Sequence, residues 1–329
     1  MDTQLRIDLL ERLGNYMREG SEAWQAAKRM AVIQNAWFTP ESVGLAEEHI
    51  TQEYLNKEKL QSWIAQYPLP GAPKKVGIVM AGNIPLVGFH DFLCGFLSGH
   101  QLLLKLSSKD TVLMAHLIKK LSEWAPEVLE QVHIAEMLKN CDAYIATGSN
   151  NTARYFEQYF RKYPSVIRRN RTSVAILDGN EGQDELMNLG KDIFSYFGLG
   201  CRNVTQVCIP EGYDLHNFLR TMEAWSGLND HNKYRNNYDY HLALYMLNRV
   251  PYFDNGSLLM VENDLPFSAV SVLHYRYYSD AESLATELRA STDIQAIIGH
   301  YGLPFGTAQR PSLSDYADGV DTMAFLCSL

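Results

Sequence analysis

Cys201 lies in the segment 197–203 (FGLGCRN), whose residue types suit a reactive thiol. Glycines at 198 and 200 let the backbone turn sharply and leave the sulfur uncrowded. A cysteine thiolate on such a turn can attack an acyl carbonyl carbon. We therefore predict that Cys201 is a nucleophile. The alternative, a core cysteine at the end of an element, stays open at this point.

The elements around Cys201 follow from hydrophobic periodicity. An apolar run with helical spacing precedes it and predicts a helix that ends just before the glycines; its members are Leu186, Leu189, Ile193, Phe194 and Phe197. A strand-like run, 205–210, follows. Cys201 is thus expected on a loop between two packed elements.

Upstream, strands and helices alternate. Residues 1–66 have a helical pattern, and the Pro- and Gly-rich segment 67–73 separates them from the next unit. We predict strands at 76–80, 101–106, 143–146 and 173–177, and helices at 84–98, 110–125 and 150–162. Beyond Cys201, helices are expected at 214–226 and 238–249, and strands at 257–262 and 269–275. Apolar strands separated by helices predict a parallel sheet that is covered on both faces.

Composition narrows the functional classes. A chain of 329 residues with 46% hydrophobic residues predicts two domains or lobes with a sizeable core. The net charge of −9 argues against a nucleic-acid-binding protein. Five cysteines without CxxC spacing, and histidines without HExxH, predict neither a disulfide framework nor a metal site. The N-terminus has no signal-peptide core, and no apolar run is long enough for a membrane span, so we expect a cytoplasmic protein.

Five short segments occur in the order in which aldehyde dehydrogenases carry similar ones. Residues 76–86 (VGIVMAGNIPL) resemble the strand and Trp-Asn-Phe-Pro-type turn of that superfamily. Residues 98–107 (SGHQLLLKLS) resemble its glycine, strand and Lys-Pro-Ser, and 146–149 (ATGS) match its Thr-Gly-Ser turn. Residues 200–207 (GCRNVTQV) fall where the nucleophilic cysteine belongs, and 303–307 (LPFGT) resemble the Pro-Phe-Gly-Gly element.

Within the superfamily, the segments 82–85 (GNIP) and 304–309 (PFGTAQ) are most similar to those of the acyl-CoA reductases related to the fatty-acid reductase subunit of bacterial luminescence. The resemblance implies an α/β, aldehyde-dehydrogenase-like fold. We expect N-terminal helices with a Rossmann-like cofactor lobe at 1–177, an α/β catalytic lobe at 178–300, and a closing segment at 301–329.

The resemblance also implies catalytic roles. Cys201 would take up the acyl group, and Asn83 would donate its side-chain amide to the developing oxyanion, together with the backbone N–H of Cys201. The alternative for Asn83 is a residue that merely forms the Asn-Ile-Pro turn.

Cofactor-binding residues follow in the same way. The family's lysine that binds the adenosine ribose matches Lys105, which precedes Ser107 and Ser108. A carboxylate at the position of Ser108 would repel a 2′-phosphate, but here the residue is neutral and Lys109 lies beside it, so NADPH is expected rather than NADH. Two further sites complete the expected cofactor contacts: the pyrophosphate-facing helix start at Gly148 and Ser149, and Phe305 in the Pro-Phe-Gly-type segment.

One departure indicates the reaction type. Hydrolytic aldehyde dehydrogenases carry a water-activating glutamate between the Thr-Gly-Ser turn and the cysteine, whereas this chain reads VIRRNRTS at 166–173. Exchange of an acyl group with a thiol needs no such base. Arg168, Arg169 and Arg171 are expected in an exposed basic turn; contact with a phosphate of the cofactor or of CoA is the alternative. Glu181 or Glu185 could still supply a base.

We therefore predict an NADPH-dependent reductase of fatty acyl thioesters, with CoA or a protein as the acyl carrier. The alternatives are oxidation of an aldehyde to an acid or acyl-CoA, and a non-catalytic homologue that binds nucleotide or an acyl carrier. An acyl-carrier protein or a synthetase is a possible partner. The usual dimer through a β-hairpin arm is in doubt, because only the proline-rich stretch 67–75 stands where longer relatives insert that arm.

Overall fold

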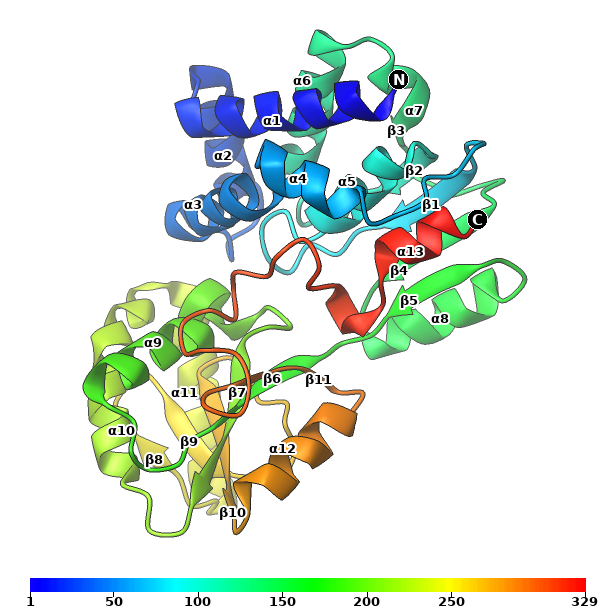
Figure 1. Ribbon diagram of the computed structural model, residues 1–329. Helices are drawn as coiled ribbons and strands as arrows, with labels where there is room; N and C mark the ends of the chain where they lie inside the picture. Colours follow the sequence, from blue (N-terminus) through cyan, green and yellow to red (C-terminus); the bar gives the residue numbers. More distant parts are fainter. The chain divides into compact units, whose positions relative to one another are not determined.

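Alternating strands and helices build two separate sheets, each in its own compact unit (Figure 1). The computed structural model describes residues 1–329. The first unit comprises Met1–Asn170 and Pro311–Leu329, and the second comprises Arg171–Arg310.

The first unit contains a five-stranded parallel sheet. Its spatial order is β3 (Val132–Ile134), β2 (Gln101–Lys105), β1 (Lys75–Val79), β4 (Ala143–Thr147) and β5 (Ser165–Arg168). The chain runs from β1 outward in one direction through β2 and β3. It then returns to the other side of β1 for β4 and β5. The strand order therefore reverses between β1 and β4, which is where open α/β sheets bind their ligands.

Helices cover both faces of this sheet. They are α1 (Thr3–Glu19), α2 (Glu22–Gln34), α3 (Pro40–His49), the π-helical η1 (Ile50–Tyr54), α4 (Lys57–Ile64), α5 (Phe89–Ser98), α6 (Val112–Trp124), α7 (Val128–Gln131), α8 (Asn150–Phe160), the 3₁₀ turn η4 (Ala317–Gly319) and α13 (Thr322–Cys327). Successive side chains of β4 show the two faces. Ile145 joins the large core under the N-terminal helices, and Tyr144 stacks on Phe160 of α8.

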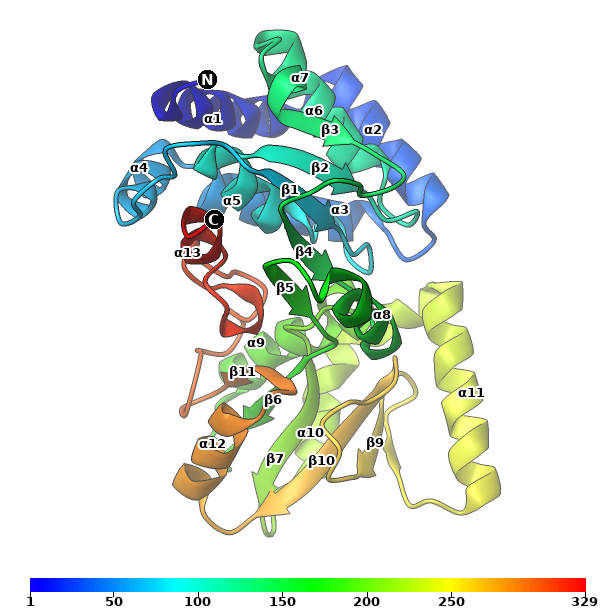
Figure 2. The same ribbon diagram turned by 90° about the vertical axis from the view of Figure 1, so that its right-hand side faces the viewer.

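The second unit contains a six-stranded sheet. Its order is β11 (Ile294–Ile298), β6 (Thr172–Ile176), β7 (Val204–Pro210), β10 (Val272–Tyr278), β9 (Leu259–Glu262) and β8 (Phe253–Asp254). The pairs are parallel except for the short edge strand β8. Figure 2 shows β11, β6, β7, β10 and β9 following one another in this order. The helical elements are α9 (Gln183–Phe194), η2 (Ser195–Gly198), α10 (Leu215–Met222), η3 (Glu223–Asp230), α11 (Asn232–Asn248) and α12 (Ala281–Ala290).

Most predicted elements are present with shifted ends. The helix expected at 84–98 begins only at Phe89, because residues 83–88 form a turn in which Leu86 has a φ of +56°. The helix before Cys201 ends at Phe194, earlier than predicted. The elements that the sequence did not predict are β3, β5, β8, β11, α7, α12, η4 and α13.

The compact units divide the chain differently from the predicted lobes. The strand expected at 173–177 was assigned to the first lobe, but β6 pairs with β7 and β11 in the second sheet. The first break therefore falls at 170/171 and not at 177/178. The expected closing segment 301–329 is also divided, because residues from Pro311 onward return to the first unit, where α13 packs against α5.

None of the helices is long and apolar enough to cross a membrane.

Candidate active site

Three segments that carry predicted catalytic or cofactor-binding residues follow neighbouring strands of the first sheet. Asn83 lies in the loop after β1, Lys105 ends β2, and Gly148 and Ser149 follow β4. Because parallel strands end at the same edge, these segments meet at the edge where the strand order reverses. The structure therefore brings together the residues predicted to bind the cofactor in this unit.

The loops after β1 and β2 approach each other closely at Gly82. A Cβ atom at this position would lie 2.6 Å from Ser107 Oγ, so only glycine fits. The Ser107 hydroxyl accepts a hydrogen bond from the Lys109 N–H at 3.2 Å. Ser108 and Lys105 are exposed. Ser107 therefore shapes the loop, while Ser108 and Lys105 present their side chains to solvent.

Asp110 binds the backbone of the loop that contains Asn83. Its buried carboxylate accepts a hydrogen bond of 2.6 Å from the backbone N–H of Leu86. Burial raises the pKa of Asp110 to about 6, and the Leu86 N–H acts in the opposite direction. Asp110 thus fixes the left-handed residue that ends this turn. The sequence analysis did not single it out, because nothing in its local context shows its burial.

The start of α8 fits the predicted pyrophosphate position. Ser149 is the N-cap, and its hydroxyl accepts the Thr152 N–H at 3.3 Å. The Gly148 N–H donates to the carbonyl of Arg168 at 3.3 Å. The helix has 11 residues, so its first turn offers backbone N–H groups and the positive end of a helix dipole.

Cys201 follows an unusual backbone segment in the second unit. After α9 ends, Tyr196, Phe197 and Gly198 have φ values of +53°, +58° and +76°. A left-handed conformation costs roughly 1–2 kcal/mol for a residue with a side chain, and here two buried aromatic residues adopt it. Strain of this kind persists only where the surroundings enforce it, and it is concentrated at functional sites.

Asn203 is the residue that enforces this turn. Its side chain is fully buried, and Oδ1 accepts the Gly200 N–H at 2.7 Å. Its amide Nδ2 donates to the carbonyls of Asp192, Ile193 and Ser195 at 3.0, 3.3 and 2.8 Å. These carbonyls end α9 and would otherwise lack helical partners. One amide therefore anchors the turn before Cys201 to the end of the preceding helix.

Of the five cysteines, Cys201 shares partial exposure only with Cys327. It is half-buried on the turn, and its carbonyl accepts a hydrogen bond from Ser173 Oγ at 3.2 Å. Burial raises the pKa of the other four thiols, those of Cys94, Cys141, Cys208 and Cys327. Thiolate formation at those four positions is therefore disfavoured.

Asp192 links the Phe305 loop to the same helix end. Its carboxylate is buried and accepts the Gly306 N–H at 2.6 Å and the Ala308 N–H at 3.0 Å. Burial raises the pKa of Asp192 to about 6, while the two N–H groups lower it. Because Asn203 binds the carbonyl of Asp192, the Phe305 loop and the Cys201 turn have one common anchor. The sequence analysis missed both anchoring residues.

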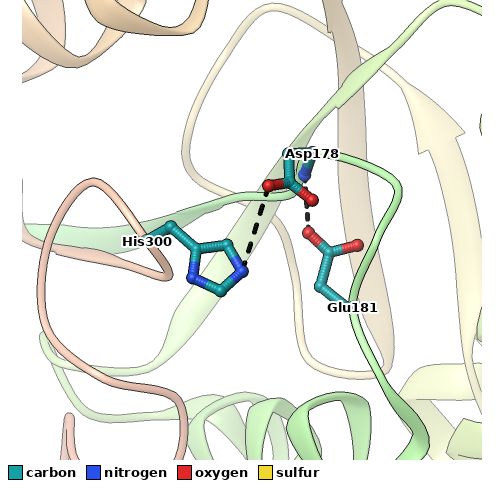
Figure 3. Close-up of side chains that lie close together, drawn as sticks. All are labelled: Asp178, Glu181 and His300. Atoms are coloured by element: carbon teal, nitrogen blue, oxygen red, sulfur yellow. Dashed lines mark hydrogen bonds and ion pairs between the residues drawn. The ribbon is translucent and has the colours of Figure 1, made fainter.

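Phe305 itself is half-buried and stands edge-on to the ring of His300, with 5.7 Å between centroids. His300 lies near two carboxylates at the end of β6 (Figure 3). Glu181 accepts the backbone N–H groups of Asp178 and Gly179 at 2.5 and 3.2 Å, and His300 Nε2 is 4.0 Å from Asp178 Oδ2. These carboxylates cap the turn after β6, so the cluster does not by itself point to a metal site.

The other carboxylate considered as a base, Glu185, is also engaged locally. It accepts the Gly182 N–H at 2.9 Å at the start of α9. Glu181 and Glu185 thus hold the loop and the helix start in their present positions.

The stretch that lacks the water-activating glutamate forms β5 and the beginning of β6. The expectation of an exposed basic turn is wrong for Arg168, which is buried in an ion pair with Asp91 of α5 and donates to Thr322 Oγ1 at 2.7 Å. Arg168 is the last residue of β5, and its side chain reaches residues of α5 and α13. Arg169 is exposed and pairs with Glu157.

The predicted site residues fall into two groups. Asn83, Lys105, Ser107, Ser108, Gly148 and Ser149 belong to the first unit, and Cys201 and Phe305 belong to the second. The shared oxyanion site of Asn83 and Cys201 therefore stays a prediction.

A family model described as "Acyl-CoA reductase (LuxC)" matches residues 7–223. A search of curated proteins by sequence found no match.

Among solved structures, an NADP-dependent enzyme of E. coli covers 91% of this chain with a TM-score of 0.67 at 13% identity, and the match spans 73% of that enzyme. An aldehyde dehydrogenase of Bacillus cereus, solved with NAD⁺, gives 0.66 at 12% identity, with coverage of 91% and 72%. The indole-3-acetaldehyde dehydrogenase AldA of P. syringae gives 0.64 at 10% identity, with the same coverage. The predicted α/β, aldehyde-dehydrogenase-like fold is confirmed.

Proposed function

Because the chain belongs to the LuxC family of acyl-CoA reductases, we propose that it reduces a fatty acyl thioester to an aldehyde with NADPH. The predicted resemblance to that branch is thereby confirmed, and the reaction is the proposal. The observation that carries it is the Cys201 turn, because its half-buried thiol follows a left-handed backbone that the buried Asn203 holds in place.

In the first step, the thiolate of Cys201 attacks the carbonyl carbon of the acyl thioester. A new S–C bond forms and the bond to the carrier sulfur breaks. The carrier leaves as a thiolate and takes up a proton. The backbone N–H of Cys201 and the amide of Asn83 are proposed to stabilise the oxyanion of this step, a contribution of about 2.7–4 kcal/mol for each donor.

The acyl-enzyme then requires hydride and not water. NADPH, when bound, supplies that hydride, and the Cys201 thiolate departs from the same carbon as the aldehyde forms. The balance is acyl thioester, NADPH and one proton to aldehyde, thiol and NADP⁺. Two observations support reduction over hydrolysis. Glu181 and Glu185 are held in local caps, and a buried arginine, Arg168, ends β5 in the stretch where hydrolytic relatives carry their base.

The first unit's residues fit a dinucleotide. Gly82 leaves the loops after β1 and β2 in close contact, and the start of α8 offers N–H groups for the pyrophosphate. Lys105 is proposed to bind the adenosine ribose. Ser108, neutral and exposed, is proposed to admit the 2′-phosphate, and Phe305 to contact the cofactor.

Purified protein incubated with NADPH and a panel of acyl-CoAs of different chain lengths tests this function. We expect loss of NADPH in step with formation of aldehyde and thiol. Cys201→Ala should abolish both, whereas Cys327→Ala, at the other half-buried cysteine, should retain them. Release of free acid without NADPH loss, or turnover of aldehydes alone, would contradict the reductase proposal. Nucleotide binding without any turnover would favour a binding protein.

A further inference from the structure

The outward face of α8 carries a line of exposed aromatic residues. The exposed fractions of Tyr155, Tyr159 and Tyr163 are 65%, 79% and 45%. Tyr155 and Tyr159 are four residues apart on α8, which places them on one side of the helix, and Tyr163 lies just beyond its end. Large aromatic side chains grouped on a surface in this way are typical of interaction sites.

Tyr155 and Tyr159 do not hold α8 on its sheet, whereas Tyr163 stands edge-on to Tyr144 of β4, with 5.3 Å between ring centroids. Ala153 is the helix's buried residue, and the packing side of α8 also carries Phe156 and Phe160, whose rings stack on each other. Phe160 in turn stacks on Tyr144 of β4, with 4.0 Å between ring centroids. The apolar side of the helix is therefore used by the protein itself, and the tyrosine side faces solvent.

Positive charge gathers on the same helix. The segment 150–170 holds five arginines and lysines and one acidic residue, in a chain whose net charge is −9. That acidic residue, Glu157, pairs with Arg169, and Arg168 is buried with Asp91. The three remaining cations, Arg154, Arg161 and Lys162, are exposed.

Arg154 and Arg161 are seven residues apart and therefore share one side of α8, next to the tyrosines. The exposed surface of the helix thus combines aromatic rings with cations and presents no carboxylate of its own apart from the paired Glu157. We define this surface by Tyr155, Tyr159, Arg154, Arg161 and Lys162, and name it the α8 face.

We propose that the α8 face docks an acidic surface of the protein that delivers the acyl group as a thioester. Tyrosine and arginine are the residue types that dominate binding energy at protein interfaces. A local positive surface on an otherwise acidic chain selects an acidic partner and steers its approach. That the partner carries an acyl thioester rests on the proposed function. That an acidic protein binds the α8 face does not.

Two other anionic partners fit less well. An anionic membrane is bound by helices whose apolar side inserts among the lipids, but Phe156 and Phe160 on that side of α8 pack within the protein. A nucleic acid is bound by basic surfaces on basic domains, and this chain carries net negative charge.

Binding of a fluorescently labelled, acidic acyl-carrier protein that bears a fatty acyl thioester tests the docking by anisotropy. The charge-reversed variant Arg154→Glu/Arg161→Glu/Lys162→Glu should bind about tenfold or more weakly at low salt, and added salt should weaken the wild type. The matched control, Lys119→Glu/Lys139→Glu/Arg220→Glu, makes the same change of net charge at exposed positions elsewhere. It should bind within about twofold of the wild type.

A second variant, Tyr155→Ala/Tyr159→Ala, tests the aromatic part. It should also weaken the carrier protein's binding, without changing the thermal unfolding midpoint, because both rings are exposed. Reduction of acyl-CoA should be unchanged in both α8-face variants, while the KM for the acyl-carrier substrate should rise.

Several results would overturn the proposal: no saturable binding of the carrier protein to the wild type, an equal loss in the matched control, or α8-face-dependent binding only to anionic vesicles or single-stranded DNA. Absence of aldehyde from acyl-CoA in the wild type would instead contradict the proposed function, and the anisotropy result would still decide the docking.

Discussion

The side-chain amide of Asn203 donates a hydrogen bond of 3.0 Å to the main-chain carbonyl of Asp192. Each partner holds one loop of the second unit. Asn203 Oδ1 accepts the Gly200 N–H beside Cys201, and the Asp192 carboxylate accepts the Gly306 N–H beside Phe305. The Cys201 turn and the Phe305 loop, which are distant in sequence, are therefore both attached to the C-terminal end of α9.

Replacement of Asn203 tests its positioning role. Asn203→Ala leaves the buried Gly200 N–H without this acceptor and removes the donor to three carbonyls. Buried groups left unpaired cost about 1–3 kcal/mol each, so we expect the free energy of unfolding to fall by about 3 kcal/mol. The acylation rate of Cys201 should also fall about tenfold or more well below the unfolding midpoint. Urea denaturation and rapid-quench acylation measure the two effects.

Asn236→Ala on the exposed surface of α11 is the matched control and should change neither quantity. NADPH affinity should be unchanged in Asn236→Ala. In Asn203→Ala it should fall only as far as the proposed Phe305 contact is lost, because the predicted cofactor segments after β2 and β4 belong to the other unit. An unaltered acylation rate in Asn203→Ala would show that the amide has a structural role only.

Asp192 gives the stability a pH dependence of known sign. Its pKa is raised by burial to about 6 in the folded protein, from an ordinary value near 4. The carboxyl group of Asp192 therefore binds its proton more tightly in the folded state than in the unfolded state. The contribution of this protonation to the free energy of unfolding is complete below about pH 4 and is lost as the pH rises through about 6. Relative to the wild type, Asp192→Asn should gain up to about 3 kcal/mol between pH 4 and pH 7.

The comparison of the two unfolding free energies across this range checks that sign. Asp110, whose pKa is also raised to about 6, remains in both proteins and cancels in the difference. If the difference between Asp192→Asn and the wild type is constant with pH, Asp192 does not titrate in this window.

The sequence predicted the parts of the fold that local patterns determine. Short runs of apolar residues such as those of β1 and β7 form buried strands, whichever sheet they join. The positions of these strands in the chain could therefore be predicted from the sequence pattern alone. The short strands β3 and β8 have only three and two residues, too few for a periodic signal. The apolar pattern of β6 predicts a strand. It does not show which strands β6 pairs with, and these partners determine the sheet to which it belongs.

The same division holds for the site. Cys201 and Asn83 could be singled out because glycines and prolines beside them shape the backbone. Asn203 and Asp192 lie in unremarkable local contexts, an asparagine after an arginine and an aspartate in a helix. Their roles depend on carbonyl and N–H groups from other segments, and such tertiary hydrogen bonds leave no periodic trace in the sequence.

Covalent labelling distinguishes Cys201 from the other thiols. After incubation with an acyl-CoA in the absence of NADPH, mass spectrometry should find the acyl group on the peptide that contains residue 201. Cys201→Ala should carry no adduct, and Cys327→Ala should be acylated like the wild type. Burial raises the pKa of the other four thiols and disfavours their thiolates. An adduct on any of those four in the wild type would refute the assignment of the nucleophile.

Ser108 tests the choice of cofactor. The residue is neutral and exposed, with the exposed cations Lys105 and Lys109 nearby in the sequence. One charge-assisted hydrogen bond to a 2′-phosphate contributes about 1.5–3 kcal/mol, or roughly ten- to a hundredfold in affinity, so NADPH should bind more tightly than NADH. Ser108→Glu should erase this preference, because a carboxylate beside the phosphate reverses the sign of the local interaction. Ser62→Glu, the same change at an exposed position of α4, should keep it. Fluorescence titration measures all three proteins, and equal or tighter binding of NADH by the wild type would contradict this account of the pocket while leaving the chemistry of Cys201 intact.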